Sequence, residues 1–155
     1  MKTAAIILAR GGSRGVPKKN TIDFCGKPLL SWTIEQCLDS GIDHSDIFVS
    51  SDSQEILNIG QEYGVGSILR TKEVSDDSAT SEISWIYSID YLKSKGLEYD
   101  WIFAPQVTSP VREPSDIVNG LLMAESGEYY SLFSAQATDQ CPLWKRHVNG
   151  LNSIG

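Results

Sequence analysis

The chain has 155 residues, a formal net charge of −7, and 41% hydrophobic and 21% charged residues. This length is enough for one domain with a real core, and the composition is that of a soluble globular protein, so we expect residues 1–155 to form a single domain. A net acidic surface repels nucleic acid at long range, which argues against a DNA or RNA partner.

The longest apolar run near the N-terminus, residues 4–9, is far too short to span a bilayer and lacks the pattern of a secretory signal. We therefore expect a cytoplasmic protein with no membrane partner. The three cysteines are odd in number and show no CxxC spacing, so neither a disulfide framework nor a zinc site is expected.

Short apolar runs alternate with stretches of helical periodicity along the whole chain. In chain order, the first half predicts a strand at 4–9, a helix from Leu30 to a stop at Gly41, a strand at 47–49, and a helix from Asp52 or Ser53 to Gly64. The second half predicts a strand at 67–69, a helix from Ser81 to Gly96, a strand at 101–103, a helix capped by Ser115, and a strand at 131–137. The apolar face of the helix after Ser81 includes Ile86, and Ile117, Val118, Leu121 and Leu122 are expected to face inward from the helix after Ser115. Caps and glycine stops set the expected helix ends.

This alternation predicts an α/β domain with a mainly parallel, helix-covered sheet and right-handed crossovers. Ligands of such sheets bind beyond the carboxyl ends of the strands. Three polar stretches follow predicted strands in this way, at residues 10–20, 50–53 and 105–112.

The first of these stretches is rich in glycine and positive charge. Residues 1–30 contain six basic residues and a single acid, although the chain as a whole is acidic. Gly11, Gly12 and Gly15 allow backbone N–H groups to approach an anion closely. The guanidinium groups of Arg10 and Arg14 match phosphate oxygens in shape and charge. The stretch therefore favours a small phosphorylated ligand.

Two familiar phosphate motifs do not fit this stretch. A P-loop requires G-x-x-x-x-G-K-[ST], and no such register exists here. A dinucleotide fingerprint opens directly into a helix, whereas Pro17 interrupts this stretch and helical periodicity starts only after Pro28. The loop is therefore long, with room for a small ligand beneath it.

The stretch ILARGGSRGVPKKN at 7–20, followed by GKPLL at 26–30, resembles the N-terminal signature of the CMP-N-acylneuraminate synthetase (acylneuraminate cytidylyltransferase) family. This family includes relatives acting on legionaminic- and pseudaminic-type sugar acids. The resemblance continues through IFVSSDSQEI, LRTKEVSDDSATS and QVTSPVR, in order and correctly spaced over residues 1–125. It implies a Rossmann-like nucleotidyltransferase domain.

The resemblance implies that residues 10–20 wrap the phosphates of CTP. Lys19 and Arg10 are the candidate catalytic residues, because a fixed ammonium beside the α-phosphate stabilises charge that develops there. The expected nucleotide-binding residues are Arg10, Gly11, Gly12, Ser13, Arg14, Lys19, Asn20, Arg70, Asp77 and Ser81. For Ser81 and Asp52, helix capping is an alternative to a role near the nucleotide.

The resemblance also implies that Gln106, Thr108 and Ser109 line a sugar-acid pocket. The family pattern there is LQPTSP, and this chain departs from it with Pro105 and Val107. The polar side chains are retained, so we expect the pocket chemistry to be retained, with a different loop shape. Arg112 either binds a carboxylate or pairs locally.

The implied reaction is attack by the C2 hydroxyl of a nine-carbon, sialic-acid-type 2-keto sugar acid on the α-phosphate of CTP, with Mg²⁺ shielding the phosphates. We expect the metal-binding aspartates, and the arm that would form a homodimer, beyond the C-terminus of this chain, which is expected to be truncated relative to the family. Three alternatives are a cytidylyltransferase for another keto sugar acid, a non-catalytic nucleotide-binding remnant, and a domain whose basic loop pairs with its own acids.

Replacing either basic residue of the loop, as Lys19→Ala or Arg10→Ala, is expected to reduce CTP-dependent activity far more than thermal stability, because both lie on a loop outside the core. Turnover and melting temperature measured on the same preparations test this. A parallel loss of both quantities would contradict the assignment.

Overall fold

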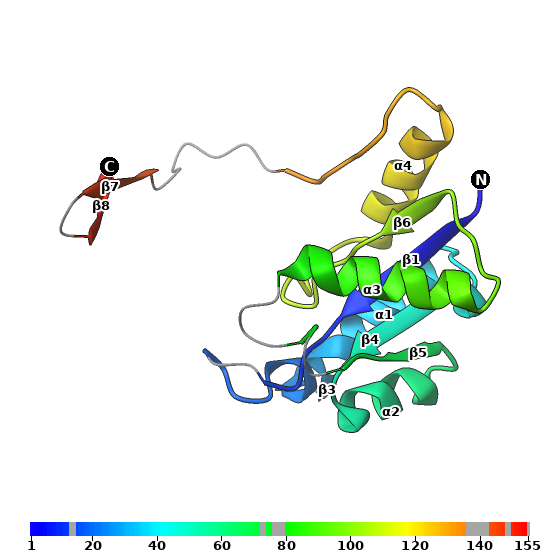
Figure 1. Ribbon diagram of the computed structural model, residues 1–155, viewed down its shortest axis with the longest axis horizontal. Coiled ribbons are helices and arrows are strands. Elements are labelled where there is room, and N and C mark those ends of the chain that lie inside the picture. The colour runs from blue at the N-terminus through cyan, green and yellow to red at the C-terminus, as the bar shows by residue number, and fades with distance from the viewer. Residues whose placement is uncertain (13–14, 72–73, 76–79, 136–142, 148–149, 155) are drawn as a thin grey trace.

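The computed structural model describes residues 1–12, 15–71, 74–75, 80–135, 143–147 and 150–154. Its centre is a four-stranded parallel sheet in the order β5-β4-β1-β6 (Figure 1). The strands are β1 (Thr3–Leu8), β4 (Ile47–Ser51), β5 (Gly66–Leu69) and β6 (Trp101–Phe103). The predicted α/β class with a mainly parallel, helix-covered sheet is confirmed.

Four helices cover the two faces of this sheet. They are α1 (Leu29–Asp39), α2 (Gln54–Glu62), α3 (Ser81–Ser94) and α4 (Pro114–Glu125). Helices α1, α2 and α4 contribute to one core cluster, whereas α3 packs on the opposite face (Figure 1). This is the arrangement that right-handed crossovers produce when a sheet grows first to one side of its central strand and then to the other.

Smaller elements complete the described chain. They are the 3-10 turns η1 (Lys19–Thr21) and η2 (His44–Asp46), and the antiparallel pairs β2 (Asp23–Phe24) with β3 (Lys27–Pro28) and β7 (Leu143–His147) with β8 (Gly150–Ile154). Along the chain, the β2–β3 pair lies between the basic loop and α1.

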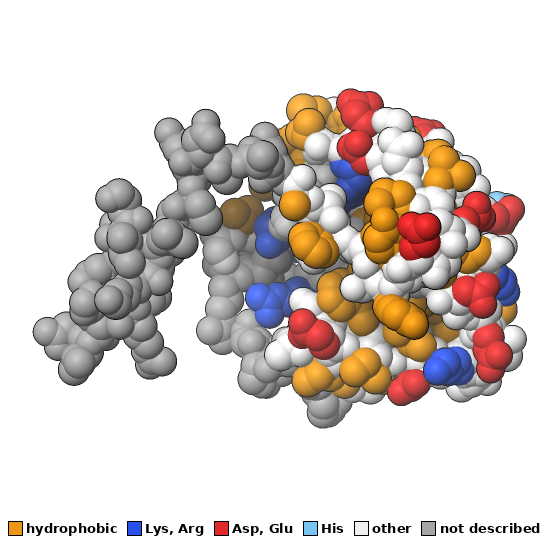
Figure 2. Space-filling model, turned by 90° about the horizontal axis from the view of Figure 1, so that it is seen from above, with side chains coloured by type: hydrophobic (Ala, Val, Ile, Leu, Met, Phe, Trp, Pro, Cys, Tyr) orange, Lys and Arg blue, Asp and Glu red, His pale blue; other side chains and the backbone are white. Residues whose placement is uncertain are grey.

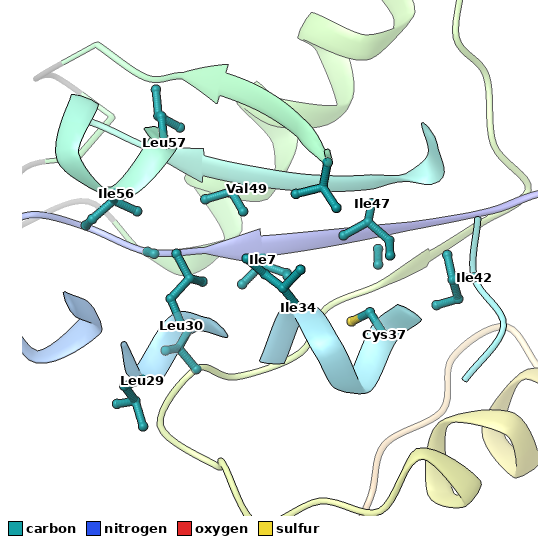
Figure 3. Close-up of a cluster of buried hydrophobic side chains, with 14 of the residues drawn as sticks. Ile7, Leu29, Leu30, Ile34, Cys37, Ile42, Ile47, Val49, Ile56 and Leu57 are labelled. Carbon is teal, nitrogen blue, oxygen red and sulfur yellow. The ribbon is translucent and has the colours of Figure 1, made fainter. Parts of the chain in front are cut away.

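The core forms around β1, whose side chains alternate between the two faces of the sheet. Ala5 and Ile7 belong to the cluster under α1, and Ala4 and Ile6 to the cluster under α3. Figure 3 shows Ile34 of α1 pointing toward the sheet beside Ile7. Each fully buried aliphatic side chain contributes about 1.5–3 kcal/mol. Burial on both faces explains why β1 is a continuous apolar run rather than an alternating one.

Three predicted helix stops are confirmed. Gly41, Gly64 and Gly96 follow α1, α2 and α3 with φ angles of 86°, 71° and 76°. These left-handed conformations favour glycine, since a side chain with a Cβ is strained there.

The C-terminal predictions were wrong in three respects. Residues 131–135 are not in a strand, and residues 136–137 of that prediction lie outside the described residues. The pair β7–β8 was not expected. Helix α4 begins at Pro114 after Glu113, not after a Ser115 cap, because the fixed φ of proline suits the first turn of a helix.

Some side chains predicted to face inward are exposed. Ile86, Val118 and Leu122 are 58%, 36% and 60% exposed, although they lie on apolar stripes with helical spacing. Such a stripe is wider than the contact that one short strand offers, so in α4 Ile117 and Ala124 are buried and the flanking positions are not. No helix in the described part of the chain combines the length and the apolar character needed to cross a membrane.

Helix α2 packs so closely on β4 that one glycine leaves no room for a methyl group. A Cβ on Gly60 would lie 2.9 Å from Cγ2 of Val49, whereas a Cβ on Gly120 of α4 would meet nothing within 4 Å. We expect Gly60→Ala to lower the free energy of unfolding by about 1–3 kcal/mol through overpacking. Gly120→Ala, the matched control, should raise it by up to about 1 kcal/mol through helix propensity. Urea denaturation measures both, and equal effects would contradict this packing.

Candidate functional site

The loops that follow the four parallel strands meet at one edge of the sheet. Strand β4 and then β5 extend the sheet to one side of β1, whereas β6 pairs with its other side. The connections therefore reverse direction at β1, and ligands of open α/β sheets bind beyond the strand ends at such a point. All three polar stretches predicted from the sequence begin at this edge.

The loop after β1 is attached to the loop after β4. The N–H of Ala9 donates to the carbonyl of Ser50 at 3.0 Å, and the N–H of Gly11 donates to Oδ1 of Asp52 at 2.9 Å. A Cβ on Gly11 would lie 3.0 Å from Cβ of Ser53, so the close approach of the two loops favours glycine. The carboxylate of Asp52 thus fixes the start of the basic loop.

This bond also answers a question left open by the sequence. The residue preceding α2 is Ser53, so the alternative that Asp52 caps that helix is wrong. The alternative that Ser81 caps α3 is also wrong, because the residue before that helix is Thr80 and Ser81 is its exposed first residue. Its expected role near the nucleotide stays a prediction.

Asn20 holds the two ends of the basic loop together. Its side chain is almost fully buried, and Nδ2 donates to the carbonyl oxygen of Arg10 at 2.9 Å. Lys19, the first residue of η1, and Arg10 are both half-buried, and Gly12 is exposed. The predicted site residues Ser13, Arg14 and Asp77 lie outside the described residues.

Lys18 has a left-handed backbone, with φ of 52°, and its Nζ lies 3.2 Å from Oε2 of Glu55. Both side chains are largely exposed, so the pair contributes at most about 1 kcal/mol. The positive charge of Lys18 is therefore paired with the Glu55 carboxylate at the surface. On the face shown in Figure 2, a group of Lys and Arg side chains gathers toward one side, and acidic side chains are spread over the remainder.

Arg70 is the most deeply buried charged group of the site. It follows β5, its backbone N–H donates to the carbonyl of Ser51 at 2.8 Å, and only 5% of the residue is exposed. Burial lowers the pKa of its guanidinium, the nearby Asp52 carboxylate opposes that shift, and the positive charge of Arg10 adds to it. Its Nε has no hydrogen-bond partner. The structure therefore brings Arg10, Asp52 and Arg70 together at the sheet edge.

The loop after β6 presents the predicted sugar-binding residues to solvent. Gln106, Thr108 and Ser109 are exposed, and the N–H of Ser109 donates to the carbonyl of Gln106 at 3.1 Å, which closes a turn. Val107, which departs from the family pattern, is 3% exposed and packs in the core under α1. The loop is thus anchored by an apolar side chain between polar ones.

Arg112 pairs locally. Its Nη1 donates to Oε1 of Gln36 at 2.9 Å, and its Nη2 donates to the carbonyl oxygen of Gln106 at 3.2 Å. Nε2 of Gln36 donates to the carbonyl oxygen of Pro110 at 2.6 Å. The structure therefore adds Gln36, from the middle of α1, to the surroundings of the site.

Two residues of this edge were absent from the predicted site set. Asp52 was predicted to lie near the nucleotide but was not included among the predicted site residues. The signal that could have identified it is its position as an acid directly after a buried strand. Gln36 gave a weaker signal, which was a polar residue among the buried positions of an amphipathic helix.

The sequence matches a family model described as cytidylyltransferase over residues 4–146. It is 42% identical over 112 residues to the pseudaminic acid cytidylyltransferase of Campylobacter jejuni, covering 72% of this chain and 48% of that protein. It is 39% identical over 134 residues to the N-acylneuraminate cytidylyltransferase of Streptococcus agalactiae, covering 84% of this chain and 30% of that protein. The chain spans half or less of the length of these relatives.

Solved structures share the fold. A CMP:2-keto-3-deoxy-manno-octonic acid synthetase complexed with CTP superimposes with a TM-score of 0.65 at 22% identity, covering 83% of this chain and 48% of the other. A cytidylyltransferase from Leptospira borgpetersenii gives a TM-score of 0.63 at 18% identity, covering 83% and 50%. At these identities the likeness concerns the arrangement of the sheet and helices.

The Asp52 carboxylate is expected to stabilise the sheet edge, because it accepts a hydrogen bond and lies near a buried cation. Asp52→Ala should lower the free energy of unfolding by about 1–3 kcal/mol. Asp52→Asn retains an oxygen that can accept a hydrogen bond from the Gly11 N–H, so its free energy of unfolding should fall by less. The control Asp39→Ala, at the exposed end of α1, should stay within about 0.5 kcal/mol of the parent. Equal losses for the three variants in urea denaturation would show that Asp52 has no special role.

Proposed function

The chain belongs to the cytidylyltransferase family, and from this premise we propose that it transfers CMP from CTP to the C2 hydroxyl of a nine-carbon 2-keto sugar acid and releases pyrophosphate. The proposal assigns the phosphates to the loop at 10–20 and to Arg70, and the sugar acid to the loop at 105–112.

The observation that carries this proposal is the buried Arg70, whose backbone N–H hydrogen-bonds to Ser51 at the edge where Asp52 holds the start of the basic loop. Burial deprives the Arg70 guanidinium of water, and its Nε has no hydrogen-bond partner within the described part of the protein. A polyphosphate would supply negative charge at this edge, and its oxygens would suit the forked donors of Arg70 and Arg10.

In the proposed reaction, the C2 hydroxyl oxygen attacks the α-phosphorus and forms a new P–O bond. The bond from the α-phosphorus to the bridging oxygen breaks, pyrophosphate leaves with the electron pair, and the hydroxyl proton is lost to solvent or base. Lys19 would stabilise the negative charge that develops on the α-phosphate. Arg10 and the N–H group of Gly12 would orient the phosphates, because the N–H of Gly11 is already bound to Asp52.

The names of the relatives support a nine-carbon substrate. The proteins that are 42% and 39% identical are named for pseudaminic acid and N-acylneuraminate, whereas the structure named for an octonic acid is 22% identical. Gln106, Thr108 and Ser109 would hydrogen-bond to the hydroxyl groups of that sugar acid.

Mg²⁺, a homodimer and a cytoplasmic location complete the proposal, and all three are expectations from the sequence. The described residues contain no group of three or more His, Cys, Asp or Glu side chains that could bind a metal ion. The described part of the chain therefore does not by itself fit a magnesium site, and no step above passes through the ion.

A second candidate function is nucleotide binding without turnover. It is favoured by one observation, which is that the described residues contain no group of three or more His, Cys, Asp or Glu side chains that could bind a metal ion. In this case CTP would bind to the sheet edge, and the catalytic metal ligands would be missing.

The decisive experiment incubates the chain with CTP, Mg²⁺ and a panel of keto sugar acids, and identifies the nucleotide product by mass spectrometry. We expect a CMP-linked sugar acid and pyrophosphate with nine-carbon acids, and little product with ATP, GTP or UTP. Product formed only with sugar 1-phosphates would overturn the proposal. Calorimetric CTP binding without turnover at any Mg²⁺ concentration would select the second candidate.

A further inference from the structure

Gln36 and Arg112, here called the Gln36/Arg112 pair, connect helix α1 to both ends of the loop after β6. Arg112 donates from Nη2 to the carbonyl oxygen of Gln106, at the start of that loop. Gln36 donates from Nε2 to the carbonyl oxygen of Pro110, near its end. The two side chains are joined to each other by the 2.9 Å bond from Nη1 to Oε1. The loop is therefore bound at both ends to one network.

Burial gives this network its rigidity. Gln36 is 7% exposed, and both polar ends of its amide are used. It sits on α1 between neighbours of the core, where Ile34 and Cys37 are fully buried. A buried amide that loses a partner incurs a desolvation penalty of about 1–3 kcal/mol, so the network strongly favours a single loop conformation.

Most side chains of the loop are exposed to solvent. Val107 is its buried anchor, whereas Gln106, Thr108 and Ser109 are exposed, and the residue after Pro110, Val111, is 92% exposed. Ordering such a loop only when a ligand binds would cost conformational entropy. A loop ordered beforehand by α1 avoids that cost.

We propose that the Gln36/Arg112 pair are positioning residues that order the 106–112 loop for the sugar acid, and that neither side chain contacts this substrate. The inference rests on the proposed function, since it assigns the loop to the sugar acid. It replaces direct carboxylate binding by Arg112, because the guanidinium already donates to Gln36 and to the Gln106 carbonyl.

The loop that the pair orders is a different loop from those proposed to hold CTP. Arg10 and Gly11 follow β1, and Arg70 follows β5, whereas the 106–112 loop follows β6. Loosening the 106–112 loop should therefore weaken use of the sugar acid and leave use of CTP nearly unchanged.

The test uses Gln36→Met, which keeps side-chain length, and Arg112→Met, which keeps most of the aliphatic stem, together with the double variant. Both substitutions remove the hydrogen bonds. We expect the KM for the sugar acid, with N-acetylneuraminate as the probe, to rise about tenfold in each single variant, while the KM for CTP changes less than about twofold. The double variant should be no worse than the single ones, because both act through one network. Arg112→Lys, which keeps the charge and loses the fork, should lie between parent and Arg112→Met.

Gln61→Met, on the exposed surface of α2, is the matched control and should leave both KM values unchanged. A large effect in Arg112→Met combined with none in Gln36→Met would identify Arg112 as a direct ligand and overturn the inference. Equal rises in both KM values would do the same, since they would indicate a general loss of structure.

Amide hydrogen exchange followed by mass spectrometry separates this inference from the proposed function. Exchange should accelerate by at least about tenfold in residues 106–112 of both Met variants and stay at the parental rate in Gln61→Met. Unchanged exchange in that loop would overturn the positioning role, whether or not the chain shows turnover. A parent protein inactive with every keto sugar acid would refute the proposed function, and the positioning of the loop would then be decided by exchange alone.

Discussion

The parallel pairing of β1 with β4 on one side and β6 on the other is the constraint on which the rest of the structure depends. Leu8, the last residue of β1, pairs with Ser50 near the end of β4, so the loops after these two strands emerge side by side. Phe103, the last residue of β6, pairs with Ala5, so the loop after β6 begins three residues earlier along the same edge. Because β1 is buried on both faces, a shift in this register would move its alternating side chains into the wrong clusters, which the core strongly disfavours.

At this edge the backbone and side chains are arranged around opposite charges. The carboxylate of Asp52 accepts a hydrogen bond from the Gly11 N–H and lies near the buried Arg70. The positive charge of Arg10 also acts on the Arg70 guanidinium. Fixing these groups before a ligand arrives is unfavourable in isolation, and the packed sheet supplies the stability that permits it. The amide of Asn20 contributes by holding Arg10 at the position where the loop leaves the sheet. A preorganised positive site of this kind suits a ligand whose charge grows during reaction.

Prediction from the sequence succeeded where local pattern and tertiary environment agree. The run at 4–9 and the glycine stops Gly41 and Gly64 depend on burial and on backbone conformation, and both are visible in residue order. Prediction failed for Val118 and Leu122, because periodicity shows which side of a helix is apolar but not how much of it a neighbour covers. It failed again at 131–135, where apolar residues alone did not establish a pairing partner.

The sequence by itself determined the class of fold, the order of its elements, and the concentration of arginine, lysine and glycine just after the first strand, because these follow from short-range preferences and composition. Only the tertiary structure decided that Asp52 accepts the Gly11 N–H instead of capping α2, and that Lys18 forms an ion pair with Glu55. It also decided that Gln36 and Arg112 join α1 to the loop after β6. These contacts link residues 37 to 76 positions apart. Which polar groups meet across such separations depends on strand order and helix placement, and no local pattern encodes them.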